Sequence, residues 1–225
     1  MIQIFIEEEV EIERIKPYVL WAIIAINVVI FIFEFVFPDI VLYYALVPSD
    51  IMSGKNLHTL VTSMFLHGSI IHILSNMYFA WVFCDDLENV YGHYMFIVFY
   101  LASGIGAGLI HALLSCALDM IFHIGLADIP CIGASGALFG ALAAYSFFFP
   151  RRRLKIYSGY VTYTITAWKF AITYAIYESL MVILGLFDYV AHTAHVGGFV
   201  TGLLIAYVFK KMSEKRIETI LEEGS

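Results

Sequence analysis

The sequence predicts an all-α membrane protein, folded as a bundle of six transmembrane helices. Of its 225 residues, 61% are hydrophobic and only 14% are charged, whereas about a quarter of the residues are charged in an ordinary soluble domain. The apolar residues fall into runs, and several reach the roughly 20 residues that span about 30 Å of hydrocarbon as a helix. Six helices and their loops take up nearly the whole chain, so no soluble domain fits in the remainder.

The six spans are expected at residues 18–37, 69–84, 93–115, 135–149, 168–187 and 190–209. The second and the fourth are short, and we expect flanking residues to extend them. This division gives an N-terminal cytoplasmic tail at 1–17, a six-helix membrane domain at 18–210 and a C-terminal cytoplasmic tail at 211–225.

The distribution of Lys and Arg predicts the orientation. With six spans the two tails share a side. Of the 12 basic residues, 11 fall in the tails, in the segment between the fourth and fifth spans, or at the adjoining ends of the fifth and sixth spans, and only Lys55 falls on the other side. The positive-inside bias therefore places both tails in the cytoplasm. The N-terminus is acidic at 7–9, which argues against a signal peptide. We expect a multi-pass protein of the cell membrane.

Charge and cysteine content argue against a nucleic-acid-binding protein and against a disulfide-rich protein. The net charge of −7 gives no support for binding nucleic acid. The three cysteines, Cys84, Cys116 and Cys131, form no CxxC pair and are odd in number, so a full disulfide framework is not expected.

Four polar residues are expected in the outer third of the membrane. Ser135 begins the fourth span, His195 lies about five residues into the sixth, and His72 and Asn76 lie in the first two turns of the second. All three of these spans run from outside to inside, so the four residues share a depth. His72 and Asn76 are four apart and therefore share a helix face. Polar groups inside a membrane are functional candidates because burying them in hydrocarbon is costly.

Small residues supply a means of bringing these spans together. Gly136 and Gly140 form a stripe on the fourth span, and Gly198 and Gly202 form one on the sixth. Stripes of this kind let helix backbones approach closely in lipid. A GxxxG pattern alone usually indicates only helix packing. Here each stripe begins beside a candidate catalytic residue, Ser135 or His195. We therefore expect the two helices to touch and to bring Ser135 toward His195.

These motifs together resemble the rhomboid family of intramembrane serine proteases. The resemblance covers about residues 18–210, with the motifs in the right order and at the right depth, and it implies the minimal six-transmembrane-helix rhomboid-like bundle. The motifs are Gly133-Ala134-Ser135-Gly136, Ala194-His195 followed by Gly198 and Gly202, and His72-x-x-x-Asn76.

The resemblance implies Ser135 as the nucleophile and His195 as its general base. A serine hydroxyl is a weak nucleophile and needs an adjacent base to take its proton. The sequence places no acid to orient His195: Asp188 and Glu178 are the nearest along the chain, and neither is expected to do so. Members of the family use a Ser–His dyad, so the resemblance does not require an acid to orient the histidine.

The resemblance also implies the groups that stabilise the oxyanion. These are His72, the side-chain amide of Asn76 and the backbone N–H of Ser135, which lies at a helix N-terminus where N–H donors are free. Gly133 is expected to let the loop approach the substrate backbone.

Two positions depart from the pattern of some rhomboids. Phe139 stands where some members have a tyrosine stacked on the catalytic histidine, and it is expected to pack against His195 without offering a hydroxyl. The first outer loop carries Lys55-Asn56-Leu57-His58 where the family often has Trp-Arg.

Other functions remain as alternatives. His192 and His195 form an HxxH pair that could hold a metal, but HExxH is absent and no nearby carboxylate ligand is expected, so neither a metal nor a cofactor is expected. The second hypothesis is a non-proteolytic relative that binds membrane proteins as a scaffold, and the third is a transporter.

The expected partners are transmembrane protein substrates and the lipid bilayer. Oligomeric state and substrate identity stay open.

Overall fold

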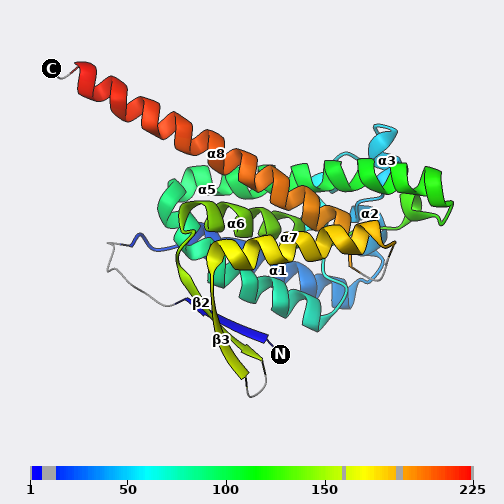
Figure 1. Cartoon of the computed structure of the whole chain (residues 1–225). Coiled ribbons are helices and arrows are strands. Elements are labelled where there is room, and N and C mark those ends of the chain that lie inside the picture. Colours follow the sequence, from blue (N-terminus) through cyan, green and yellow to red (C-terminus); the bar gives the residue numbers. More distant parts are fainter. Residues whose placement is uncertain (1, 7–13, 159–160, 186–189, 224–225) are drawn as a thin grey trace.

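Residues 2–6, 14–158, 161–185 and 190–223 are described by the computed structural model, and most of them are helical (Figure 1). The long helices are α1 (Tyr18–Val36), α5 (Ile70–Phe122), α6 (Ser135–Phe148), α7 (Ala167–Ile183) and α8 (His192–Glu223). The connections contain three short helices, α2 (Ile40–Tyr44), α3 (Pro48–Met52) and α4 (Thr59–Thr62), and two 3₁₀ turns, η1 (Ser63–Phe65) and η2 (Leu126–Asp128).

Helix α5 is interrupted at Gly92, where the chain turns back on itself (Figure 1). The backbone there has φ 70° and ψ 162°, a positive φ that glycine adopts without the penalty of a Cβ. A straight helix of 53 residues would be about 80 Å long, far more than the roughly 30 Å of a bilayer core. The two arms of α5 therefore correspond to the second and third predicted spans.

A helix lies at each of the six predicted segments, but not all are long enough to count as spans by themselves. Helices α1, α5 and α8 are long and apolar enough to cross a membrane, whereas α6 is apolar but has only 14 residues. Residues 186–189, at the junction of the fifth and sixth predicted spans, lie outside the described residues. The chain is a mostly helical membrane protein, and the count of six crossings stays a prediction.

Helix α6 forms the centre of the bundle, between α5 and α8 (Figure 1). Every residue from Gly136 to Tyr145 is buried, and most of them are glycine or alanine, so neighbouring backbones can approach closely. The outer helices instead expose large apolar side chains such as Phe35, Ile71 and Trp81. In a membrane these exposed side chains face lipid.

A small sheet makes the prediction of an all-α fold incomplete. Strands β1 (Ile2–Ile6), β2 (Arg153–Ser158) and β3 (Val161–Thr166) form an antiparallel sheet in the order β1-β2-β3. In β2, Leu154 and Ile156 are buried, whereas Arg153 is exposed and Lys155 half-buried, which is the period-two alternation of a strand. In the sequence the basic residues of this segment indicate the orientation, and the short alternation between them was not recognised as a strand.

Ion pairs join three segments at one end of the bundle. Arg152 lies 3.0 Å from Asp86, and Arg14 lies 3.2 Å from Asp85. The N-terminal segment, the end of the first arm of α5 and the loop after α6 therefore meet here, near the sheet. The segment that carries Lys55 lies at the opposite end, beside α3 (Figure 1).

Candidate active site

Helices α6 and α8 pack backbone against backbone through their glycines. A Cβ on Gly198 would overlap the carbonyl oxygen of Gly136, and a Cβ on Gly202 would overlap the Cα of Gly140. No side chain fits at either position of α8. The two stripes therefore meet, and they hold the first turn of α8 beside the first turn of α6.

Ser135 is the first residue of α6 and is partly exposed. The first N–H groups of a helix have no acceptor inside the helix, and the helix dipole favours negative charge at this end. Gly133, two residues earlier, has φ 124°, a conformation that requires glycine. Its N–H donates to the Ser63 carbonyl oxygen at 2.9 Å, which fixes the loop that leads into α6.

The loop at Gly133 passes directly over His72 and Asn76. A Cβ on Gly133 would stand 2.7 Å from Nε2 of His72 and 3.6 Å from Nδ2 of Asn76. Both side chains come from the first arm of α5, and they share a helix face as their spacing predicted. The polar groups expected to bind an oxyanion thus gather around the loop two residues before Ser135.

His67 contacts Asn76, although His67 was not among the residues predicted for the site. Its Nε2 is 2.9 Å from Nδ2 of Asn76, and its ring contacts that of His72 with centroids 4.9 Å apart. The backbone N–H of His67 donates to both carboxylate oxygens of Glu34 on α1, at 3.0 and 3.1 Å. Glu34 thus ties α1 to the segment that leads into α5 and carries His67.

His195 lies in the first turn of α8 and stacks on Phe139. The ring centroids are 4.1 Å apart and the planes are inclined by 9°. Phe139 is one helical turn after Ser135 and therefore on the same side of α6. Within the described residues the Ser135 hydroxyl makes no hydrogen bond to His195, and such catalytic contacts often tighten only when substrate binds.

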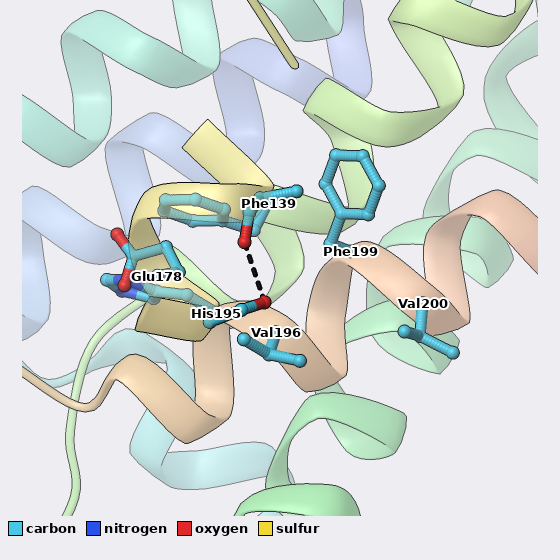
Figure 2. Close-up of a pocket in the computed structure, with 8 residues that line it drawn as sticks. Phe139, Glu178, His195, Val196, Phe199 and Val200 are labelled. Atoms are coloured by element: carbon cyan, nitrogen blue, oxygen red, sulfur yellow. Dashed lines mark hydrogen bonds and ion pairs between the residues drawn. The ribbon is translucent and has the colours of Figure 1, made fainter. Parts of the chain in front are cut away.

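Glu178 on α7 lies beside His195, which corrects the expectation that no acid would do so. Oε2 of Glu178 is 3.1 Å from Nδ1 of His195, and Figure 2 shows these two side chains next to each other. The same oxygen is 2.5 Å from Nδ1 of His192. The shorter contact is a hydrogen bond, and the longer one has the distance of an ion pair without hydrogen-bond alignment. Glu178 is distant along the chain, but α7 packs on α8. Asp188, the other acid considered, lies outside the described residues.

A second polar contact fixes the first turn of α8 from the other side. Nδ1 of His111, on the second arm of α5, is 2.6 Å from Oγ1 of Thr193. Both side chains are buried. The turn that carries His195 is therefore held by α5 and α7 as well as by α6.

Glu178, His192 and His195 also form a set of donors that could hold a metal ion. One ligating atom of each lies within 4.8 Å of the others, and two histidines with one carboxylate form catalytic zinc sites in other proteins. The expectation that no carboxylate would lie near the HxxH pair was therefore wrong. In the structure Oε2 of Glu178 already contacts Nδ1 of both histidines.

A mostly apolar pocket lies beside His195 (Figure 2). It is formed between α6, α7 and α8, and the imidazole of His195 and the carboxylate of Glu178 are at one end of it. Its lining consists of Phe139, Ala175, Glu178, Ser179, His195, Val196, Phe199 and Val200.

The amino-acid sequence matches one family profile and several curated proteins. Residues 54–212 match the profile of the Rhomboid domain. The chain is 29% identical over 186 residues to Rhomboid protein 1, mitochondrial, of Saccharomyces cerevisiae, an alignment that covers 80% of this chain and 49% of the yeast protein. It is 31% identical over 168 residues to RHOMBOID-like protein 1 of Arabidopsis thaliana, covering 73% of this chain and 38% of that protein.

A further relative is the Presenilin-associated rhomboid-like protein, mitochondrial, of Mus musculus. It is 31% identical over 144 residues, which are 64% of this chain and 36% of the mouse protein. In each of the three alignments the chain spans less than half the length of the curated relative.

Proposed function

Because the chain belongs to the rhomboid family, we propose that it is an intramembrane serine endopeptidase with Ser135 and His195 as its catalytic dyad. The observation that carries the proposal is the convergence of three helices on the first turn of α6. His72 and Asn76 of α5 meet the loop before Ser135, and His195 of α8 stacks on the residue one turn after it.

The first half of the reaction forms an acyl-enzyme. Oγ of Ser135 attacks the carbonyl carbon of the scissile peptide bond while His195 takes the hydroxyl proton on Nε2. The carbonyl oxygen becomes an oxyanion in the tetrahedral intermediate. As the C–N bond breaks, His195 returns the proton to the leaving nitrogen, and the new amine terminus departs.

The oxyanion is stabilised by donors that are in place before the reaction starts. His72, the amide of Asn76 and the backbone N–H of Ser135 supply these donors, and the N-terminal end of α6 adds its dipole. Donors of this kind act strongly because they need no reorganisation during the reaction. Loss of one donor in a soluble serine protease costs about 10²–10³ in kcat.

The second half of the reaction uses water. His195 removes a proton from a water molecule, which attacks the acyl carbonyl carbon, and the Ser135 oxygen leaves with the proton that His195 carries. Water must therefore reach the start of α6. Irregular backbone at membrane depth, such as the loop at Gly133, is tolerated only inside protein or against a water-filled cavity, and we propose that the partly exposed Ser135 faces such a cavity.

The proposed substrates are other membrane proteins, cut within or next to a transmembrane helix. A buried α-helix hides its carbonyl carbons, because each C=O is bonded to an N–H along the helix. The substrate must therefore unwind at the cut site, so segments that contain helix-weakening residues are the expected targets.

We propose that the site opens to the face opposite the two tails. The basic end of the bundle carries the N-terminal segment and the loop after α6, which the positive-inside bias places in the cytoplasm. The cell membrane is the proposed location. The yeast and mouse relatives are named mitochondrial, and separation of membranes with markers for both locations distinguishes the two.

The test is cleavage of a panel of transmembrane substrates in liposomes by the parent protein and by the variants Ser135→Ala and His195→Ala. We expect the parent to cut and both variants to fall to background. Equal cutting by Ser135→Ala would refute the serine mechanism. A folded parent that binds the panel but cuts none of it would instead favour the non-proteolytic scaffold.

A further inference from the structure

Glu178 is a buried carboxylate that faces two imidazoles. It is 3% exposed, and its Oε2 is 2.5 Å from Nδ1 of His192 and 3.1 Å from Nδ1 of His195. An unpaired charge at this depth would cost far more than a paired one, so the carboxylate depends on these partners. The dyad described above makes no use of it.

The position of this carboxylate distinguishes the two nitrogens of His195. A carboxylate only accepts hydrogen bonds, so a neutral imidazole that turns Nδ1 toward it carries its proton there. Nε2 is then left with a lone pair, which is the form that can take a proton from Ser135.

Stacking on Phe139 does not make this distinction. It fixes the plane of the His195 ring, within 9° of parallel. A ring that turns by 180° about its Cβ–Cγ bond keeps the stack but exchanges the positions of Nδ1 and Cδ2. Only a polar partner at the edge of the ring separates the two orientations, and Glu178 is that partner.

His192 holds the carboxylate in place. It lies one turn before His195 on α8, and it shares the same oxygen of Glu178 at the shorter distance. The carboxylate therefore keeps a hydrogen bond while the His195 ring moves during proton transfer. His72 and His111 of α5 also lie close enough to His195 to interact with it electrostatically, and neither is an anion.

We propose that Glu178 is a positioning residue for His195, selecting the ring orientation that presents Nε2 to Ser135 and balancing the positive charge formed on the imidazole. This inference rests on the protease function proposed above. Glu178 acts through His195 and touches no substrate, so it differs from the two catalytic residues.

The test uses Glu178→Gln, which keeps the size of the side chain and removes its charge. We expect kcat to fall at least about tenfold, less than the about 10⁴-fold loss known for the corresponding change in a soluble triad, with KM unchanged because ground-state binding is not touched. Glu178→Asp, which keeps the charge, should recover part of kcat.

Glu88→Gln is the matched control. Glu88 is also a fully buried carboxylate, but it accepts the Leu20 N–H at 2.8 Å near the opposite end of the bundle. We expect this variant to lose thermal stability while keeping the parent kcat. If Glu178→Gln behaves like Glu88→Gln, the positioning role is wrong and the dyad alone stands.

Histidine ¹⁵N chemical shifts test the contact without a substrate. In the parent we expect His195 to carry its proton on Nδ1, and in Glu178→Gln we expect a mixture of the two tautomers. A parent with the proton on Nε2 would overturn the proposal even if it cleaves. A parent with the expected tautomer but no cleavage would count against the protease function and leave the contact established.

Discussion

The side-chain amide of Asn76 lies 2.9 Å from Nε2 of His67, and this contact aims the amide at the loop before Ser135. The amide nitrogen is a donor, so Nε2 of His67 acts as the acceptor and the proton of a neutral His67 ring is on Nδ1. His67 is 1% exposed, and its backbone is held by Glu34. The proposed oxyanion donor therefore has a rigid support, the kind of preorganisation on which such donors depend.

Asn76→Ala is expected to lower kcat by about 10²–10³-fold with little change in KM, because the lost bond forms mainly in the transition state. His67→Ala should lower kcat less, since the amide remains but is no longer held. In the double variant the effects should not add, because the amide that His67 holds is already removed by the Asn76 substitution. The measurement is kcat of the parent, the two single variants and the double variant. If the two losses in activation free energy add strictly, His67 acts independently of Asn76.

Gly198→Ala is expected to destabilise the protein by about 1–3 kcal/mol or more, the usual cost of overpacking. Its methyl group would overlap the Gly136 carbonyl oxygen and separate α8 from α6, so cleavage should be lost with it. Gly68→Ala is the control, since a Cβ there would meet only Ile132 at 3.6 Å. Thermal unfolding in detergent measures both, and equal stability of the two variants would contradict the close packing.

Helices and their close packing could be predicted from the sequence because both depend on local composition. An apolar run long enough for the bilayer marks a helix, and the four-residue spacing of Gly198 and Gly202 marks the face on which another backbone can approach. The break of α5 was found as a gap between two apolar runs, and Gly92 supplies the φ that the turn requires.

The position of Glu178 could not be predicted in the same way. Which residue of α7 faces His195 depends on how α7 is rotated about its axis, and a helix with apolar residues on most of its faces gives no preferred direction. His67 was missed because its role comes from a contact nine residues away with Asn76, across the start of α5. Strand β2 was missed because its alternation covers only six residues.

Phe139→Tyr is expected to keep parent activity, because the stack on His195 depends on the ring and not on a hydroxyl. Phe139→Leu should lower kcat about tenfold, since a branched aliphatic chain cannot hold the imidazole plane and an aromatic pair contributes about 0.5–1.5 kcal/mol beyond burial. Cleavage rates at matched folded fraction measure both. Parent-like kcat in Phe139→Leu would show that the stack does not position His195.

Treatment with EDTA is expected to leave cleavage unchanged. Oε2 of Glu178 already contacts Nδ1 of His192 and of His195, and a metal on Nδ1 of His195 would displace the carboxylate. The measurement compares cleavage before and after chelation, with a zinc protease as the positive control for the chelator. Activity that is lost with EDTA and restored by Zn²⁺ would assign the cluster to a metal.

Cysteine labelling tests the orientation that the basic residues predict. In a background in which the three native cysteines are replaced by alanine, Lys55→Cys and Met212→Cys each introduce one exposed thiol. A membrane-impermeant maleimide added to intact cells should label position 55 at once and position 212 only after the membrane is opened. Retained cleavage by the background protein checks that it is folded. Labelling of position 212 in intact cells would place the tails outside and the candidate active site toward the cytoplasm.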